Sequence, residues 1–285
     1  MTPFNSTVCA LGEGPLWHPE RKSMFWFDIV GKKLFNQTAD GAVEWQFDEY
    51  VSAAGWVDHD TLMLASETAL YRFDIATGTR DKICALDAEN PVTRSNDGRA
   101  DPWGGFWIGT MGIKGEPNVG AIYRYYRGEV RTIVPTLSIS NAICFAPDRS
   151  CAYYTDTPTL KITRFDLDPE TGWPTGDAKV CIDLSQANMR PDGAVTDSEG
   201  NLWVALFGGG RVVCFSPDGT LLREVPLPVK NTTCPAFGGP DMRDLYVTSA
   251  TIKLTPEDIQ ERPQSGMTFH IPDVTNGVPE PQVIL

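Results

Sequence analysis

Four side chains with oxygen donors stand at equivalent places in a repeating sequence pattern, although they are far apart along the chain. They are Glu13 in "GEGPLW", Asn96 in "SNDGRA", Asn141 in "SNAICF" and Asp192 in "PDGAVT". Carboxylate and carboxamide oxygens are hard donors that suit divalent cations. The set contains no His and no Cys, so a tetrahedral structural zinc site is disfavoured. A cation held by few protein ligands would leave positions open for water or substrate, as Lewis-acid hydrolysis requires.

The charges of these residues also favour a shared site. If the carboxylates of Glu13 and Asp192 were buried together, one would have to take up a proton unless a cation neutralised them. Arg94 lies two residues before Asn96, so on an extended chain both side chains point the same way. Its guanidinium could hydrogen-bond the hydroxyl or carbonyl oxygens of a bound molecule. Taken singly, each residue could instead form a turn or a surface ion pair, and Asn96, followed by an Asp-Gly pair, fits a turn best.

The elements that would position these residues recur along the chain at intervals of roughly 40–50 residues. Each unit has a short first strand, a turn built on Pro, Asp, Gly or Asn, and a second strand rich in aromatic and β-branched residues. Weaker third and fourth strands follow. The six units begin at Glu13, Ala54, Asn96, Asn141, Asp192 and Phe237. This pattern predicts an all-β fold, a six-bladed β-propeller with about four antiparallel strands per blade. A β-sandwich would fit the strands but not the period.

In a propeller the first strands of the blades surround a central channel, so residues at one end of these strands converge. The second strands carry a series of aromatic residues, which we expect to pack between blades and not to stack on a cofactor. The series comprises Trp26, Trp107, Tyr154, Trp203 and Tyr246. No Gly- or Ser-rich linker interrupts the units, so residues 1–285 are expected to form a single domain.

Composition excludes several classes of partner. The net charge of −13 disfavours nucleic acid and anionic membrane surfaces, both of which need clustered Lys and Arg.

The seven cysteines form no C-x-x-C pair and are expected to be reduced thiols. The N-terminal sequence lacks the pattern of a signal peptide, and no apolar run reaches membrane-spanning length, so a cytoplasmic location is predicted. No G-x-S-x-G elbow occurs and none of the three histidines begins a unit, which disfavours a serine triad.

Several of these motifs together resemble the SMP-30/gluconolactonase family, also called regucalcin-like. They are "LGEGPLW", "RSNDGRADPWGGFWIGTM", "ISNAICFAPD", "RPDGAVTDSEGNLWVA" and "FGGP…LYVTSA", and they span almost the whole chain. The resemblance implies a six-bladed propeller and, for most members, metal-dependent hydrolysis of aldonolactones to aldonic acids. It implies Glu13, Asn141 and Asp192 as metal ligands, and Arg94 and Asn96 as substrate contacts.

We therefore expect a hydrolase whose partner is a small-molecule sugar lactone and whose cofactor is one divalent cation. Calcium, zinc, manganese and iron all tolerate such ligands. The cation would polarise the lactone carbonyl, and Asp192 is the expected general base because one carboxylate oxygen can face water while the other binds metal. The oligomeric state is expected to be a monomer or a small homo-oligomer.

One position departs from the family pattern. Animal members carry an acidic residue soon after "GTM" that helps bind sugar hydroxyls, and the corresponding place here is Lys114, with Glu116 two residues further on. Lys114 is thus a candidate substrate contact, and the sugar specificity is expected to differ. Two alternative functions fit the same scaffold. One is another propeller hydrolase, acting on phosphotriesters or other lactones, and the other is a non-enzymatic calcium-binding propeller.

Overall fold

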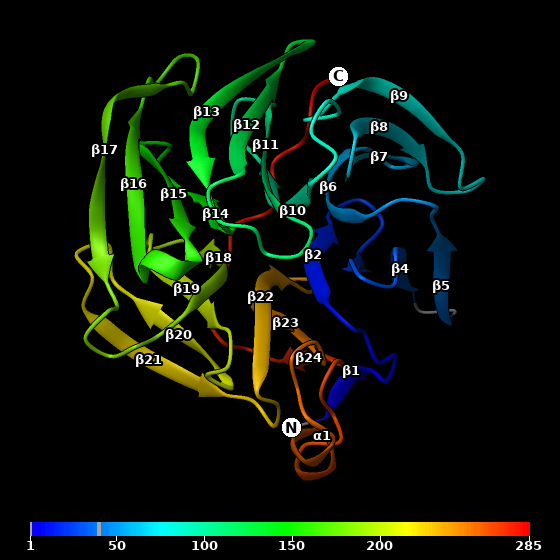
Figure 1. Cartoon of the computed structure of the whole chain (residues 1–285), viewed down its shortest axis with the longest axis vertical. Helices are drawn as coiled ribbons and strands as arrows, with labels where there is room; N and C mark the ends of the chain where they lie inside the picture. The colour runs from blue at the N-terminus through cyan, green and yellow to red at the C-terminus, as the bar shows by residue number, and fades with distance from the viewer. Residues whose placement is uncertain (1, 39–40) are drawn as a thin grey trace.

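The computed structural model describes residues 2–38 and 41–285, and it confirms the predicted six-bladed β-propeller (Figure 1). Six four-stranded antiparallel sheets are arranged around a central channel. In each blade the first strand is innermost and the others follow outward, so the chain order within a blade matches the spatial order. In blade 6 alone, the fourth strand comes from the N-terminus.

The strands have the following bounds. Blade 1 contains β2 (Gly12–His18), β3 (Ser23–Asp28), β4 (Lys33–Thr38) and β5 (Gly41–Gln46). Blade 2 contains β6 (Val51–Asp58), β7 (Thr61–Ser66), β8 (Ala69–Asp74) and β9 (Arg80–Ala85). Blade 3 contains β10 (Thr93–Ala100), β11 (Phe106–Gly112), β12 (Gly120–Tyr126) and β13 (Glu129–Leu137). Blade 4 contains β14 (Ser140–Phe145), β15 (Cys151–Asp156), β16 (Lys161–Leu167) and β17 (Pro174–Asp183). Blade 5 contains β18 (Pro191–Thr196), β19 (Leu202–Leu206), β20 (Arg211–Phe215) and β21 (Leu221–Pro226). Blade 6 contains β22 (Asn231–Gly238), β23 (Asp244–Ala250), β24 (Thr268–Ile271) and β1 (Pro3–Asn5).

Two short helices complete the described elements. A single 3-10 turn covers Thr157–Thr159, and helix α1 spans Pro256–Glu261 between β23 and β24. Helix α1 begins with a capping box in which Thr255 and Asp258 bond each other's backbone N–H groups. None of the described helices is long and apolar enough to cross a membrane.

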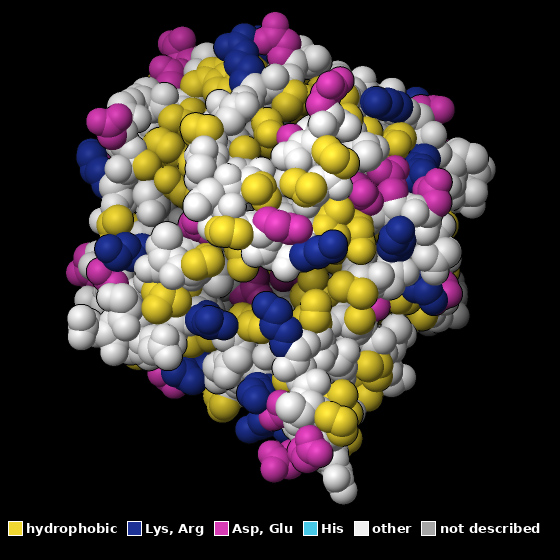
Figure 2. All heavy atoms as spheres, viewed as in Figure 1, with side chains coloured by type: hydrophobic (Ala, Val, Ile, Leu, Met, Phe, Trp, Pro, Cys, Tyr) yellow, Lys and Arg dark blue, Asp and Glu magenta, His cyan; other side chains and the backbone are white. Residues whose placement is uncertain are grey.

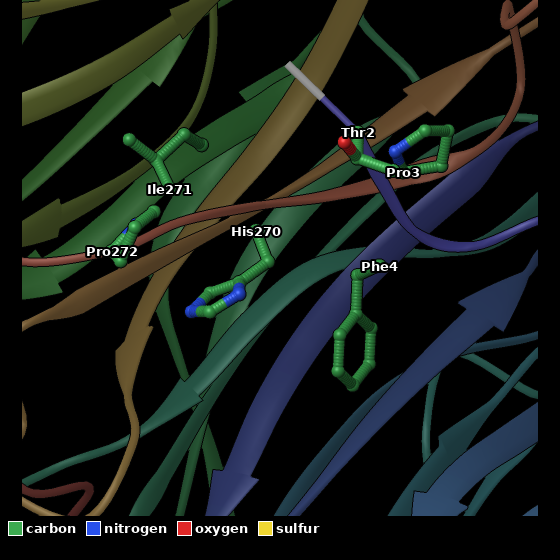
Figure 3. A pocket seen from close by; sticks show the side chains of 6 residues that line it. All are labelled: Thr2, Pro3, Phe4, His270, Ile271 and Pro272. Carbon is green, nitrogen blue, oxygen red and sulfur yellow. The ribbon is translucent and has the colours of Figure 1, made fainter.

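The N-terminal strand closes the ring. Strand β1 pairs with β24, so the first and last strands of the chain share one sheet, and the outer edge of blade 6 is a strand of only three residues. Figure 3 shows Phe4 and His270 extending from these two strands. The ring of Phe4 meets that of Tyr246 edge-on at 5.0 Å between centroids, and a cavity of about 670 Å³ opens at this seam. The seam lies at the outer edge of blade 6, away from the channel.

The core lies between the blades, as the aromatic series predicted. Trp26 and Trp107 have no exposed surface, and Trp203 is 2% exposed. Trp107 of blade 3 packs edge-on against Phe145 of blade 4 with ring centroids 5.4 Å apart. Burying a large apolar side chain stabilises a fold by about 1.5–3 kcal/mol, so these inter-blade contacts hold the ring together.

The C-terminal segment crosses the ring on the face away from the viewer in Figure 1 and ends beside blade 3. Backbone bonds fasten it to two blades: Val283 donates to the carbonyl of Trp56, and Ile284 donates to the carbonyl of Gly104. Before these bonds along the chain, the carboxylate of Glu280 forms an ion pair with Arg99 of β10. Both of these side chains are buried, so the segment places a charge pair at the far end of the channel.

Candidate active site at the channel mouth

Four of the predicted site residues occupy the second position of an innermost strand. They are Glu13 of β2, Arg94 of β10, Asn141 of β14 and Asp192 of β18. Their exposed fractions lie between 3% and 6%. Asn96, two residues after Arg94, is 5% exposed. Because the innermost strands pack side by side around the ring, their equivalent ends gather at its centre. Figure 2 shows a hollow there with acidic side chains inside, and we call this hollow the chamber.

A break in strand pairing follows each of these positions. The pairing of the first and second strands shifts between Glu13 and Leu16, between Ser95 and Gly98, between Asn141 and Cys144, and between Pro191 and Ala194. Such bulges bend a strand and redirect its side chains, and they are frequent beside active sites. Gly14 and Ala142 adopt left-handed backbone conformations at two of them, with φ of 53° and 55°. A side chain at position 14 would also collide with the carbonyl of Ser52, which explains the Gly in "GEGP".

The chamber is rich in carboxylates that are short of neutralising charge. Burial, and then the charge of nearby Asp97, raises the pKa of Glu13 to about 8. Burial, together with the charges of Glu13 and Asp97, also raises the pKa of Asp192 well above its usual range. Asp97, whose pKa burial raises to about 6, is a third buried acid. Arg94 is the cation that faces Glu13 and Asp192, and burial lowers its own pKa to about 10.

A chain of hydrogen bonds connects the two amides of the site. Nη1 of Arg94 donates to Oδ1 of Asn96 at 2.8 Å, and Nδ2 of Asn96 donates to Oδ1 of Asn141 at 2.9 Å. Nδ2 of Asn141 donates in turn to Oγ1 of Thr157 at 3.0 Å. The hydroxyl of Thr157 then donates to the carbonyl of Pro191 at 2.8 Å, next to Asp192 in sequence. The chain thus joins blades 3, 4 and 5.

The ends of this chain fix the orientation of both amides. The guanidinium of Arg94 can only donate, so Asn96 must present Oδ1 to it and Nδ2 to Asn141. The carbonyl of Pro191 can only accept, so Thr157 uses its proton there and must accept from Nδ2 of Asn141. Oδ1 of Asn141 therefore accepts from Asn96, and its second lone pair could bind a cation.

Asp97 stabilises the strand bulge that follows Asn141. Its Oδ2 accepts the backbone N–H of Ile143 at 2.7 Å, within the bulge that follows Asn141. This bond ties β10 to β14 and holds the bulge that aims Asn141. The sequence placed Asp97 in a turn beside Asn96, but the pair lies within strand β10.

The structure corrects the starting points of two repeats. Ala54 and Phe237 are not at the channel mouth, because β6 begins at Val51 and β22 begins at Asn231. Both side chains are buried apolar residues of the core. The second residues of β6 and β22 are Ser52 and Thr232, which carry small hydroxyl side chains. The hydroxyl of Ser52 donates to Oγ of Ser95 at 2.8 Å. A small hydroxyl residue does not mark the start of a strand in the sequence, whereas the turn motifs further along these two repeats stand out. The starts of these repeats were therefore predicted too late.

Lys114 is not one of the buried residues of the chamber, although its loop follows the β11 residues that pair with Thr93 and Arg94. It is exposed in the loop between β11 and β12, and its backbone N–H donates to Oε2 of Glu116 at 2.9 Å. Among the described residues, Lys114 makes no ion pair with the chamber carboxylates. Its contact with substrate stays a prediction.

The donor set fits a divalent cation of the hard type. Within residues 2–38 and 41–285, no group of three or more His, Cys, Asp and Glu side chains is arranged to hold a metal ion. The predicted ligand set contains only two side chains of these four types, Glu13 and Asp192. Its third ligand is the carboxamide oxygen of Asn141. Buried, mutually repelling carboxylates beside an oriented amide oxygen are chemically suited to Ca²⁺ and similar ions.

Comparison with known proteins places this geometry in a family context. A model of the SMP-30/gluconolactonase/LRE-like region matches residues 11–251. A solved structure of regucalcin from Agrobacterium tumefaciens, described as a calcium-binding protein, superposes with a TM-score of 0.97 at 37% identity, over 99% of this chain and 97% of that one. The 6-deoxy-6-sulfogluconolactonase of Pseudomonas putida is 36% identical over 91% of this chain and 90% of its own length. The L-arabinolactonase of Azospirillum brasilense is 34% identical over 94% of this chain and 90% of its own length.

Proposed function

This chain belongs to the SMP-30/gluconolactonase/LRE-like family, and we propose that it is a lactonase that hydrolyses a sugar lactone to the aldonic acid, using a divalent cation held by Glu13, Asn141 and Asp192. The observation that carries the proposal is that two buried acids, the charge of one raising the pKa of the other, and one oriented amide hold the same position in the innermost strands of three blades. The relatives named as lactonases, which match this chain along nearly their whole length, give the reaction class.

Each residue of the site would have its own role in ester hydrolysis. A divalent cation bound here supplies Lewis-acid polarisation of the lactone carbonyl. Arg94 and Asn96 lie beside the ligand set and would orient the sugar through hydrogen bonds to its oxygens. Asp192 would accept a proton from the attacking water as the water oxygen bonds to the carbonyl carbon. The ring C–O bond then breaks, and the departing ring oxygen takes up a proton to become a hydroxyl.

The raised carboxyl pKa values match this role. In the absence of a cation, Glu13 and Asp192 repel each other and resist ionisation. A bound cation would favour the charged forms of both, and would leave Asp192 ionised and able to take a proton near neutral pH. Cation binding and general-base function are therefore coupled through the same carboxylate.

A second candidate is calcium binding without catalysis. It is favoured by the description of the Agrobacterium tumefaciens regucalcin as a calcium-binding protein. Calorimetry with Ca²⁺ and a lactone assay on the same preparation separate the two. Tight binding with no turnover of any lactone would support the non-enzymatic role.

The test is a panel of aldonolactones assayed by acid release, with Ca²⁺, Mn²⁺, Zn²⁺ and Fe²⁺ each returned to metal-stripped protein. The proposal expects hydrolysis that depends on added metal and a loss of at least about 100-fold in kcat for Asp192→Asn, because the general base is gone. An exposed control, Asp177→Asn on β17, should keep full activity. Full turnover by metal-free Asp192→Asn protein would contradict the proposal.

A further inference from the structure

A cationic pocket lies beside the channel mouth, over blades 5 and 6. It has a volume of about 490 Å³ and lies among the loop before β18, the β19–β20 turn, the start of β22 and the segment after β23. Four cations line it: Arg190, Arg211, Lys230 and Lys253. No Asp or Glu is among the described residues of the lining. This concentration is unusual in a chain with a net charge of −13. Figure 2 shows Lys and Arg side chains on the rim of a central hollow that has acidic side chains deeper inside.

The pocket is close to the proposed catalytic carboxylate. Arg190 precedes Asp192 by two residues, so their backbones are at most about 7 Å apart. The backbone at Arg190 is fixed, because its carbonyl accepts the N–H of Phe207 at 3.0 Å. On the opposite wall, Nδ2 of Asn231 donates to the carbonyl of Ile252 at 2.8 Å and anchors the segment that carries Lys253. The pocket therefore lies beside the strand that carries Asp192.

Two of the four cations are free to bind a ligand. Nζ of Lys230 is paired with Asp258 at 2.9 Å, and Nε of Arg211 lies 3.4 Å from Glu224. Arg190 and Lys253 are exposed and have no ion-pair partner within the described part of the chain. Electrostatic attraction inside a concave site is stronger than on an open surface, because the walls exclude part of the solvent.

The glycine run in this pocket contributes space and backbone. The residues of "FGGGR" before Arg211 form the turn between β19 and β20. Gly208 and Gly210 have φ of 80° and 61°, which L side chains rarely adopt. A side chain at position 210 would also collide with the carbonyl of Val229. The turn thereby leaves room beside Arg190 that a bulkier sequence would fill.

We infer that this pocket is a subsite for an oxyanion carried by the far end of the lactone substrate, a sulfonate, phosphate or carboxylate, with Arg190 and Lys253 as its recognition residues. The inference rests on the proposed lactonase function and narrows its substrate class to anionic sugar lactones. A guanidinium suits such groups because its fork of N–H donors matches two oxygens at once. A neutral sugar would gain nothing from the pocket, so charge at the distal carbon becomes the determinant of specificity.

The test compares lactones that differ only in the distal group: glucono-lactone, 6-phosphoglucono-lactone and 6-deoxy-6-sulfoglucono-lactone. In Arg190→Gln/Lys253→Gln, kcat/KM for the two anionic lactones should fall about tenfold or more, mainly through KM, because the charged contacts are lost. The value for the neutral lactone should stay within about twofold. Lys82→Gln on the outer strand β9 makes the same kind of charge change outside the pocket and should leave all three unaltered. Equal losses on neutral and anionic lactones, or none on either, would overturn the subsite.

A binding measurement separates this inference from the proposed function. Calorimetry with 6-phosphogluconate and gluconate needs no turnover, and the subsite predicts tighter binding of the phosphorylated acid that weakens with salt. If no lactone is hydrolysed but this preference exists and disappears in the double variant, the lactonase proposal fails and the subsite stands. If the neutral lactone is hydrolysed but neither acid is preferred, the subsite fails alone.

Discussion

Nδ2 of Asn141 lies 3.0 Å from Oγ1 of Thr157, and this hydrogen bond fixes which atom of the amide donates there and which remains an acceptor. Thr157 itself is held by its bond to the carbonyl of Pro191. A residue in a short 3-10 turn of blade 4 therefore orients a proposed metal ligand and braces the strand that carries another. Thr157 is a positioning residue, since it contacts the ligand side chain and not the substrate.

Thr157→Val should weaken cation binding while leaving the fold intact. Valine matches the shape of threonine but neither accepts from Asn141 nor donates to Pro191, so the amide loses its fixed orientation. Loss of an outer-shell partner typically lowers metal affinity by about 10–100-fold. Calorimetric titration of metal-stripped protein with Ca²⁺ or Mn²⁺ measures this directly. Thr157→Ser keeps the hydroxyl and should restore affinity, and equal weakening in both variants would mean that the hydroxyl is not the cause.

Replacing a chamber acid should stabilise the metal-free protein even as activity is lost. The pKa of Glu13 is raised to about 8 by burial and by Asp97, so the folded state holds a proton that the unfolded state has released. Stability of the metal-free wild type should therefore fall as pH rises from about 4.5 to 8. Glu13→Gln removes the contribution of Glu13 to this dependence and should raise the melting temperature at pH 8, while Asp97 and Asp192 keep theirs. Thermal unfolding with and without added cation measures both effects, and saturating Ca²⁺ should flatten the wild-type profile. A Glu13→Gln protein less stable than metal-free wild type at pH 8 would contradict the charge argument.

His18 should make the protein more sensitive to acid. Burial lowers its pKa from 6.5 to about 4. Its Nδ1 accepts the backbone N–H of Arg21 at 3.2 Å while Nε2 lies 3.1 Å from the carbonyl of Asp58, so the neutral ring satisfies both partners. The unfolded chain binds a proton on this ring first, so the ring's contribution to stability is complete above pH 6.5. It is lost as pH falls toward 4, by up to about 3 kcal/mol.

The measurement is the free energy of unfolding of wild type and His18→Gln across this pH range. Their difference isolates the histidine, because the other titrating groups are common to both proteins. The gap between them should narrow as pH falls from 6.5 to 4. A gap that is constant with pH would show that His18 does not titrate differently in the two states.

Glu280→Gln should destabilise the fold without altering the chemistry of the channel mouth. It removes the ion-pair partner of the buried Arg99 guanidinium, and breaking a buried pair on one side costs about 3–5 kcal/mol. Denaturant unfolding gives the loss. Arg99→Met/Glu280→Leu removes both charges of the pair and should recover most of the stability. Failure of the double variant to recover would show that the pair also fixes the C-terminal segment through its hydrogen bonds.

The sequence by itself determined the architecture and most of the candidate site. Repetition of turn and aromatic motifs predicted six blades, since each four-stranded unit can bury its faces only against neighbours. Equivalent positions in those repeats identified Glu13, Asn141 and Asp192, because polar residues at the start of an apolar strand stand out from their surroundings. Where the strand began with small hydroxyl residues, as at Ser52, the repeat was placed too late.

Only the tertiary structure decided which groups touch. Thr157 is sixteen residues beyond Asn141 and Pro191 is a further blade away, and no periodicity connects them. The cationic pocket is likewise formed by four segments from two blades. No single one of these segments indicates a binding site in the sequence. Strand patterns depend on local alternation of apolar and polar residues, so they can be predicted from neighbours in sequence. Hydrogen-bond partners and pocket walls depend on the closure of the ring, which brings distant residues within bonding distance.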